Sequence, residues 1–332
     1  MKGAMASIAI SAALVMVGSA AWPFPDSSHT YPGKPESVII GEKPFESSAL
    51  VYITEDQGYF AGNGLNVTMQ NYDSAPLAIN GLGKQETDIA LSSEFAVTEN
   101  ILNEENISVI GCVDRFLQIY LIGRKDRGIE CISDLKGKKI GTSIGGSGVF
   151  YLGRFLDLHG MSMQDITLVD LPTSQYVNSL ANGSVDALIT GIYFDQIQEQ
   201  LSSNAVIWAV QSNQPGYWVI SCQSDWAASH PEQINRLLKS LNQAEEYTIK
   251  HPEEAKAVVQ KKLNFTDAYL ESIWPKHQFS LALDQSLIAA MEDEARWMIS
   301  NNLTAKKTVP DFTDYIYTKG LEEVKPDAVN IW

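Results

Sequence analysis

The chain of 332 residues has few cysteines and a deficit of basic side chains. Cys112, Cys131 and Cys222 are too few for a disulfide scaffold, and they lack the paired spacing of a zinc site, so we expect no metal. One bridge or three free thiols both remain open. The 24 Lys and Arg residues against 40 Asp and Glu give a formal net charge of −16, which argues against a nucleic-acid partner. The basic residues between 124 and 139 are interpreted as solvated side chains that flank strands.

Long apolar runs are also absent after the first 21 residues. Residues 4–18 carry no charge, follow Lys2 and precede the small residues at 19–21, which is typical of an export signal peptide. The uncharged segment 4–21 has 18 residues, near the minimum length for a membrane span, so a retained N-terminal anchor stays open. Residues 22–36 predict a linker rich in Pro, Ser and Gly. Either way, we expect the body of the protein to be extracytoplasmic, periplasmic or at the cell surface.

From residue 37 onward, short apolar strands alternate with helical segments. Strands are expected at residues 38–40, 66–69, 88–91, 109–113, 116–123, 138–141, 166–171, 186–189, 206–209 and 218–222. This alternation predicts an α/β protein with largely parallel sheets. The segments 116–123 and 218–222 are expected to cross out of a first unit and return to it. The chain after residue 222 is expected to be mainly helical.

Two parts of the sequence resemble a family of solute-binding proteins. The stretch GYFAGNGLNV at 58–67 is similar to a hallmark of the nitrate/sulfonate/taurine-type receptors of ABC importers, a group with thiamine-pyrimidine relatives. DLKGKKIG at 134–141, GGSG at 145–148 and LANGSVDA at 180–187 follow in the order and spacing of that family. The resemblance extends over residues 37 to 300.

This resemblance implies a type II periplasmic-binding-protein fold, in which two α/β lobes are joined by two hinge crossovers around a ligand cleft. Residues 37–122 and 222–332 would form lobe 1, and residues 123–221 would form lobe 2. A ligand that contacts both lobes would favour their closed arrangement. The resemblance also implies an ABC permease and ATPase as partners. We expect a monomer that meets the membrane only through its N-terminal segment or the permease.

The candidate ligand-binding residues follow strands or open helices, where a sheet's carboxyl edge exposes polar groups. Free N–H groups at the helix after the turn 145–148 suit a sulfonate, carboxylate or nitrate oxygen, although a serine N-cap with turn glycines is the alternative. The resemblance favours ligand contact. The complete set is Ser47, Ser48, Ser92, Ser93, Glu94, Gly145, Gly146, Ser147, Gly148, Ser174, Gln175, Thr190, Tyr193, Asp195 and Trp218.

Several members of this set have a structural alternative. Helix capping explains the serine pairs 47–48 and 92–93 equally well. Glu94, if it faced the cleft, would favour a ligand with an amine, such as taurine, but it could instead be a first-turn residue in water. Tyr193 and Trp218 could belong to the core. No arginine is clearly placed for a ligand, so an anion would be recognised by backbone dipoles.

An enzyme is the competing interpretation. Residues 141–145 match G-x-S-x-G, but a nucleophile elbow needs a helix directly after Ser143, and here further turn residues intervene. Of five histidines only His277 lacks an obvious structural role. We therefore expect no catalytic residue and no cofactor. The predicted ligand is an aliphatic sulfonate or taurine, with nitrate, bicarbonate or a thiamine-pyrimidine precursor as alternatives. A pyrimidine-precursor synthase, a menaquinone-pathway enzyme and a ligand-sensing module remain alternatives on the same scaffold.

Overall fold

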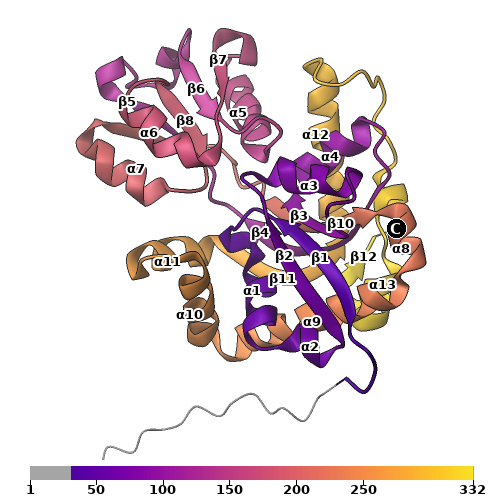
Figure 1. Ribbon diagram of the computed structural model, residues 1–332. Coiled ribbons are helices and arrows are strands. Elements are labelled where there is room, and N and C mark those ends of the chain that lie inside the picture. Colours follow the sequence, from indigo (N-terminus) through magenta and orange to yellow (C-terminus); the bar gives the residue numbers. More distant parts are fainter. Residues whose placement is uncertain (1–30, 332) are drawn as a thin grey trace, which may run out of the picture.

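The computed structural model describes residues 31–331, and it contains two lobes that each carry a β-sheet (Figure 1). The predicted α/β fold with two lobes is therefore confirmed. The signal peptide or anchor at 1–21, and the linker as far as residue 30, lie outside the described residues. Within residues 31–331, no helix combines the length and apolar character that crossing a membrane requires.

The helices and strands have the following bounds. The strands are β1 (Glu36–Glu42), β2 (Leu65–Asn71), β3 (Ile89–Ser93), β4 (Ile107–Phe116), β5 (Tyr120–Arg124), β6 (Lys139–Thr142), β7 (Thr167–Asp170), β8 (Ala187–Thr190), β9 (Ala205–Ala209), β10 (Gly216–Gln223), β11 (His277–Asp284) and β12 (Val329–Asn330). The helices are α1 (Ala49–Asp56), α2 (Tyr59–Gly62), α3 (Ala75–Gly83), α4 (Glu94–Leu102), α5 (Ser147–Leu158), α6 (Tyr176–Ala181), α7 (Phe194–Leu201), α8 (Ser224–Ser229), α9 (Pro231–Lys250), α10 (Pro252–Leu263), α11 (Asp267–Ile273), α12 (Gln285–Ser300) and α13 (Lys319–Val324).

The larger sheet has the strand order β12-β11-β4-β10-β3-β1-β2. Its N-terminal strands β1, β2 and β3 run parallel, and β10, β4 and β11 continue the sheet with antiparallel pairs. Every residue of β3 is buried, as expected for a strand that helices cover on both faces. In β1 the pattern alternates, so that Val38 and Ile40 enter the core while Ile39 is exposed. This lobe thereby provides a rigid support for the loops that follow β1 and β3.

The smaller sheet has the order β7-β6-β8-β5-β9, and β5 runs antiparallel to both of its neighbours. The sequence predicted one strand over 116–123, but β4 ends at Phe116 in the larger sheet and β5 begins at Tyr120 in the smaller one. Residues 117–119 and 210–215 therefore link the two sheets, whereas the predicted boundaries lay at 122/123 and 221/222. A continuous apolar run indicates burial, and it does not say in which sheet each half pairs.

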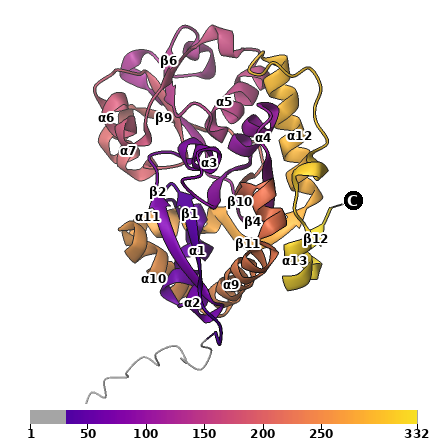
Figure 2. The same cartoon turned by 45° about the vertical axis from the view of Figure 1, so that its right-hand side comes forward.

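The C-terminal region differs from its mainly helical prediction. β11 adds to the edge of β4, and β12 pairs with β11. The helix α12 lies beside α4 of its own lobe and α5 of the other lobe (Figure 2). Trp297 of α12 packs against Phe150 of α5 with ring centroids 5.7 Å apart, and Asp293 forms an ion pair with Arg154. This side of the molecule therefore holds the two lobes together without any ligand.

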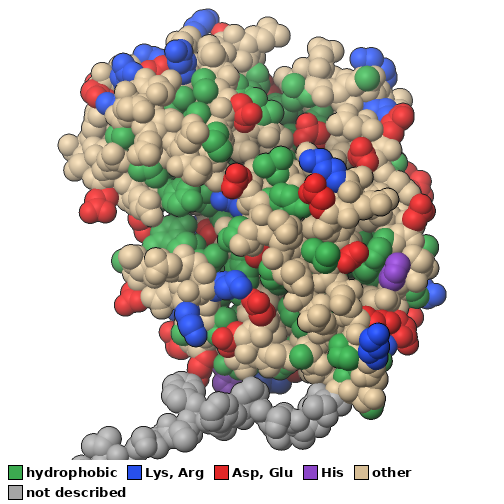
Figure 3. Space-filling model, viewed as in Figure 1, with side chains coloured by type: hydrophobic (Ala, Val, Ile, Leu, Met, Phe, Trp, Pro, Cys, Tyr) green, Lys and Arg blue, Asp and Glu red, His purple; other side chains and the backbone are tan. Residues whose placement is uncertain are grey.

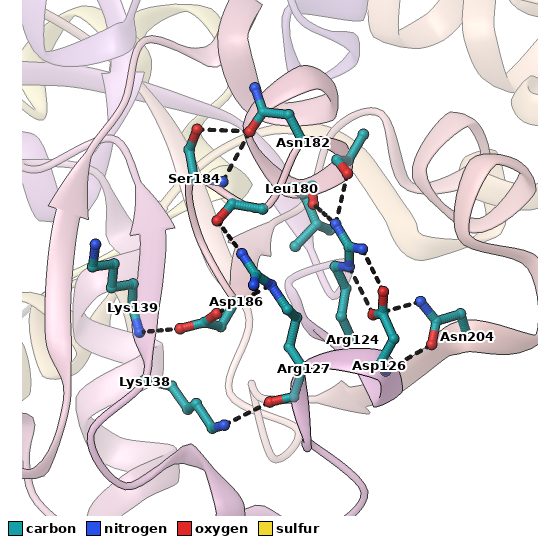
Figure 4. Close-up of polar contacts among 12 residues, drawn as sticks. Arg124, Asp126, Arg127, Lys138, Lys139, Leu180, Asn182, Ser184, Asp186 and Asn204 are labelled. Carbon is teal, nitrogen blue, oxygen red and sulfur yellow. Dashed lines mark hydrogen bonds and ion pairs between the residues drawn. The ribbon is translucent and has the colours of Figure 1, made fainter.

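The basic residues near 124–139 include side chains with specific partners in lobe 2 (Figure 4). Arg124 donates to the carbonyl oxygens of Leu180 and Ala181 at 2.6 Å each, where α6 ends. The same guanidinium pairs with Asp126 at 2.6 Å and lowers the pKa of that carboxyl. Cations at a helix C-terminus satisfy its orphan carbonyls. The prediction of solvated flanking charges was wrong for Arg124, which joins β5 to α6.

Candidate functional site

A cleft lies between the two lobes, at the carboxyl ends of β1, β3, β6 and β8. Its empty volume, including the mouth, is about 720 Å³, a size typical of small-molecule sites. Figure 3 shows apolar side chains on both sides of the opening between the lobes. The lining residues are Lys43, Phe45, Ser74, Ala75, Pro76, Ser93, Phe116, Gln118, Ile119, Thr142, Ser143, Gly146, Ser147, Gly148, Thr173, Tyr176, Ile189, Thr190, Gly191, Ile192 and Trp218.

Aromatic side chains of lobe 1 form much of the apolar wall. Phe45 follows β1 and Trp218 lies on β10, and their ring centroids are 5.4 Å apart. The indole Nε1 of Trp218 donates to Ser48 Oγ at 3.1 Å, so the ring is fixed at its polar end and is almost fully buried. Phe116 adds a further ring beside the first link between the lobes. An aliphatic or aromatic part of a solute would bury its surface against this wall.

Lobe 2 presents the N-terminus of α5 to the cleft. The N-cap residue is Gly146, and no side chain caps this helix, which excludes the interpretation of Ser147 as its N-cap. Ser147 is 8% exposed and lines the cleft. A Cβ on Gly148 would lie 3.1 Å from Thr142 Oγ1, so glycine lets the helix start close to the end of β6. Unpaired N–H groups at such a terminus attract anions.

Lys43 is a cation of the cleft that sequence reasoning missed. Its ammonium donates to Thr173 Oγ1 of the other lobe at 2.9 Å, and the Thr173 hydroxyl donates onward to the carbonyl oxygen of Asp73 at 3.3 Å. Burial lowers the pKa of Lys43, and the charges of Glu46 and Asp73 oppose that change. Lys43 thus adds positive charge to the cleft and also contacts both lobes, where the sequence predicted recognition by dipoles alone.

A chain of buried polar side chains extends from Gln118, which lines the cleft, into lobe 1, and we call it the floor network. His277 Nδ1 lies 2.6 Å from Asp114 Oδ2, and its Nε2 lies 3.1 Å from Gln118 Oε1. The amide Nε2 of Gln118 donates to Glu46 Oε1 at 2.9 Å, and the Tyr269 hydroxyl approaches the same oxygen at 3.3 Å. Because Gln118 lies in the link 117–119, this network fixes one hinge segment to lobe 1.

The ionised groups within the floor network stabilise one another's charged forms. Burial alone lowers the pKa of His277, but the charge of Asp114 and its hydrogen bond outweigh it, so the pKa is raised. Burial raises the pKa of Glu46, and the charge of His277 partly offsets this. With Gln118 Oε1 facing the ring, both nitrogens of His277 donate. The histidine therefore has no free nitrogen that could accept a proton from a serine.

The G-x-S-x-G serine is not part of such a dyad. Ser143 lines the cleft from lobe 2, and its backbone N–H donates to the hydroxyl of Tyr176 at 2.7 Å. Among the described residues, no hydrogen bond connects Ser143 with His277. A Ser-His-Asp arrangement requires the histidine next to the hydroxyl. Among the described residues, Ser143 and His277 therefore do not form such a pair.

The predicted site residues fall into three groups. Those that line the cleft are Ser93, Gly146, Ser147, Gly148, Thr190 and Trp218. Those that line an adjoining chamber are Tyr193 and Asp195. Those that line neither space are Ser47, Ser48, Ser92, Glu94, Gly145, Ser174 and Gln175. Ligand contact remains a prediction for the first two groups, and the third group has the structural roles described next.

Three serines of the third group, Ser47, Ser48 and Ser92, are buried in lobe 1. Ser48 accepts the indole N–H of Trp218, and the Ser92 hydroxyl donates to the carbonyl oxygen of Ser93 at 3.4 Å. Ser47 is completely buried. Ser93 combines two roles, because its hydroxyl caps α4 by accepting from Ala96 N at 3.4 Å and also lines the cleft. Capping was one of the two interpretations left open for this serine.

Three further candidates, Ser174, Gln175 and Gly145, do not line the cleft themselves but neighbour residues that do. Ser174 and Gln175 are exposed, and their neighbour Thr173 lines the cleft instead. Gly145 has a φ of 84°, and a Cβ there would lie 3.1 Å from Glu99 Oε2 of lobe 1. Such a backbone conformation favours glycine, so Gly145 shapes the turn before α5.

Glu94 does not face water or the cleft. It lies completely buried in the first turn of α4, opposite the equally buried Glu294 of α12. Burial raises the pKa of Glu94 to about 8, and burial together with the charge of Glu94 raises the pKa of Glu294. Thr98 donates its hydroxyl to Glu294 at 3.0 Å. Burial of two neighbouring carboxyl groups disfavours their charged forms.

Several lining residues had no distinguishing signal in the sequence. Phe116, Ile119 and Ile189 belong to apolar strands or links whose core role is the ordinary interpretation. Gln118 and Lys43 are single polar residues beside strand ends. Strand ends were used to select serines, and the same rule applied to the residue directly after β1 would have found Lys43.

A model of the family described as "NMT1/THI5 like" matches residues 46–255. This match includes more than half of the chain. The chain belongs to the NMT1/THI5-like family. A protein of Brucella abortus named as a binding protein is 23% identical over 244 residues, which cover 68% of this chain and 70% of that protein. A Bacillus subtilis protein, whose name describes it as binding aliphatic sulfonates, is 22% identical over 84% of this chain and 86% of its own. These relatives support a solute-binding role.

Solved structures show the same fold. The alkanesulfonate-binding protein SsuA from Xanthomonas axonopodis pv. citri, bound to MOPS, superimposes with a TM-score of 0.75 over 86% of this chain and 99% of its own, at 17% identity. The desulfurization enzyme DSZB superimposes with a TM-score of 0.63 over 88% of this chain and 99% of its own, at 15% identity. The periplasmic-binding-protein fold is thus shared by binding proteins and an enzyme, and the fold alone does not separate them.

Proposed function

We propose that the protein is an extracytoplasmic receptor that captures a small organic anion, an aliphatic sulfonate by preference, and delivers it to an ABC importer. One observation carries this proposal. The N-terminus of α5 and the side chain of Lys43 line the same cleft from opposite lobes, together with a largely apolar wall. A compact anionic group would bind the polar part, and an apolar chain would bury itself against Phe45 and Trp218.

The similar proteins support this choice of ligand. The names of the Bacillus relative and of the Xanthomonas structure both refer to sulfonates, and the MOPS bound to the latter carries a sulfonate group. The expected signal segment at residues 1–21 supports an extracytoplasmic location. Transfer to a permease and ATPase is inferred from the resemblance to ABC receptors.

An enzyme is the second candidate, because DSZB shares the fold. One of its structures carries a cysteine-to-serine substitution and a bound sulfinic acid. In the present chain none of Cys112, Cys131 and Cys222 lines the cleft, and burial raises the pKa of both Cys112 and Cys222 to about 12. A cysteine nucleophile must be an accessible thiolate. Catalysis by a cysteine nucleophile in this cleft is therefore disfavoured. A receptor function requires no reacting group.

Thermal unfolding with a panel of solutes tests the proposal. The panel contains hexanesulfonate, taurine, nitrate, bicarbonate and an aminopyrimidine, each at millimolar concentration. A ligand that binds the folded state stabilises it by about 2.7 kcal/mol at about a hundredfold excess over Kd. We expect the largest increase in Tm with hexanesulfonate. An increase with the pyrimidine alone would contradict the sulfonate assignment, and turnover of any solute would contradict the receptor function.

A further inference from the structure

A second chamber adjoins the cleft and shares three lining residues with it, Lys43, Phe45 and Ile192. Lobe 2 forms one wall with the start of α7, and lobe 1 forms the other with the connection between α10 and α11. The empty volume of the chamber, including its opening, is about 1290 Å³. Because both lobes line it, a group bound here would contact both of them, as in the first cleft.

Aromatic side chains surround this chamber. Tyr193, Phe265, Tyr269 and Phe45 all line it, and the rings of Phe265 and Tyr269 meet edge to face with centroids 4.7 Å apart. Tyr193 has a φ of 58°, which is a strained backbone conformation for a bulky side chain. Such conformations persist where the surrounding structure imposes them, and they gather at ligand sites. Aromatic faces attract cations through their electron-rich surfaces.

The charge of the chamber is negative in spite of two lysines. Asp195 and Glu199 lie on α7, and Glu46 lies at the end of the floor network. Lys262 pairs with Glu55 at 2.6 Å, and its ammonium lies 5.5 Å from the ring centroid of Tyr52, so its charge is already engaged. Lys43 donates to Thr173 at the boundary with the first cleft. Lys43 keeps its charge at that boundary, whereas Asp195 and Glu199 form no ion pair among the described residues and give the lobe 2 wall of the chamber a negative charge.

One hydrogen bond and one pKa shift connect Asp195 with the opposite wall of the chamber. Asp195 Oδ2 accepts a hydrogen bond from Ser272 Oγ of the other lobe at 3.4 Å. Burial raises the pKa of Tyr269, and the charges of Glu46 and Asp195 raise it further. The phenol of one wall is thus exposed to the negative potential of both carboxylates. A cation placed between them would be attracted, whereas a second anion would be repelled.

We propose that the chamber is a second subsite, built from Tyr193, Tyr269, Asp195 and Glu199, for the positively charged end of a zwitterionic solute. This inference rests on the proposed function, because the anionic end of the same solute would bind at α5. The two ends would lie on opposite sides of Lys43. The preferred solute is accordingly an elongated sulfonate with a distal amine, which is longer than taurine.

Isothermal titration calorimetry of the full-length protein with two matched sulfonates tests this subsite. Heptanesulfonate and ω-aminohexanesulfonate have chains of equal length and differ by a terminal methyl against an ammonium group. We expect the amine to bind at least about tenfold more tightly. Equal affinities, or tighter binding of heptanesulfonate, would overturn the subsite and leave the proposed function intact. The absence of binding by both compounds would overturn the proposed function itself.

Variants that remove charge test whether the carboxylates of α7 cause the preference for the amine. In Asp195→Asn/Glu199→Gln we expect the preference for the amine to fall to about twofold or less, while the affinity for heptanesulfonate is unchanged. Asp157→Asn removes one charge from an exposed position at the end of α5, and it should retain the preference. A double variant that keeps the full tenfold preference would overturn the assignment. A loss of affinity for both compounds would show that these carboxylates support the fold of the cleft and do not recognise the amine.

Discussion

Replacement of one member of the buried carboxyl pair, Glu94→Gln, tests the electrostatics of the contact between α4 and α12. Burial raises the pKa of Glu94 to about 8, so the folded protein keeps a proton that the unfolded chain releases near pH 4.5. The stabilisation from this proton is complete below the unfolded pKa, and it is lost as the pH rises towards the folded pKa. At about 1.4 kcal/mol per pH unit for one proton, the loss between pH 5 and pH 7 is about 3 kcal/mol.

Urea unfolding followed by tryptophan fluorescence at several pH values between 5 and 8 measures this loss. Glutamine cannot titrate, so we expect the stability of Glu94→Gln, relative to the original protein, to improve by about 3 kcal/mol from pH 5 to pH 7. Glu130→Gln, at an exposed position, should follow the original protein at every pH. A stability difference for Glu94→Gln that does not change with pH would refute the reasoning that Glu94 holds a buried proton.

Three further predictions concern the cleft and its floor. Lys43→Gln should weaken the binding of hexanesulfonate about tenfold in calorimetry, because a cation that contacts both lobes is lost. Unchanged affinity would show that Lys43 bridges the lobes and does not bind the anion. His277→Leu should lower the free energy of unfolding in urea by about 3 to 5 kcal/mol, because the buried Asp114 loses its partner. The added substitution Asp114→Asn should recover part of this loss, and a loss below about 1 kcal/mol for His277→Leu would contradict the charged pair. Trp218→Ala should reduce affinity more for octanesulfonate than for ethanesulfonate, since the longer chain buries more surface against the ring; equal losses would remove Trp218 from the apolar wall.

Most of the architecture could be predicted because apolar periodicity reports burial directly. The alternation of strands and helices over residues 37–222 predicted the two α/β lobes, and the resemblance supplied the cleft between them. The split of 116–123 between β4 and β5 was not predictable, since both halves are equally apolar. β11 was missed because half of its residues, such as His277 and Gln278, are polar, so the segment lacks the apolar run of a buried strand.

The lining of the cleft was predictable at strand ends and helix starts, as at Ser147. The lining was not predictable where packing against distant segments decides which way a side chain points. Glu94 immediately follows Ser93 in the sequence, yet one residue lines the cleft and the other meets Glu294 from the distant helix α12. His277 gained its partners only when β11 was placed beside β4. Contacts of this kind depend on segments far apart in the chain, and a single sequence carries no local signal for them.

The central claim is that the N-terminus of α5 binds the anionic group of a solute, and Ser147→Asp tests it most directly. The helix dipole stabilises a carboxylate at this position, so the fold should be retained. The same carboxylate would occupy the proposed binding position and repel an anionic ligand. In calorimetric titrations, hexanesulfonate should bind the original protein, bind Ser147→Ala more weakly, and give no measurable heat with Ser147→Asp. Without ligand, both variants should have the Tm of the original protein. Equal affinity of Ser147→Asp and the original protein would contradict the account.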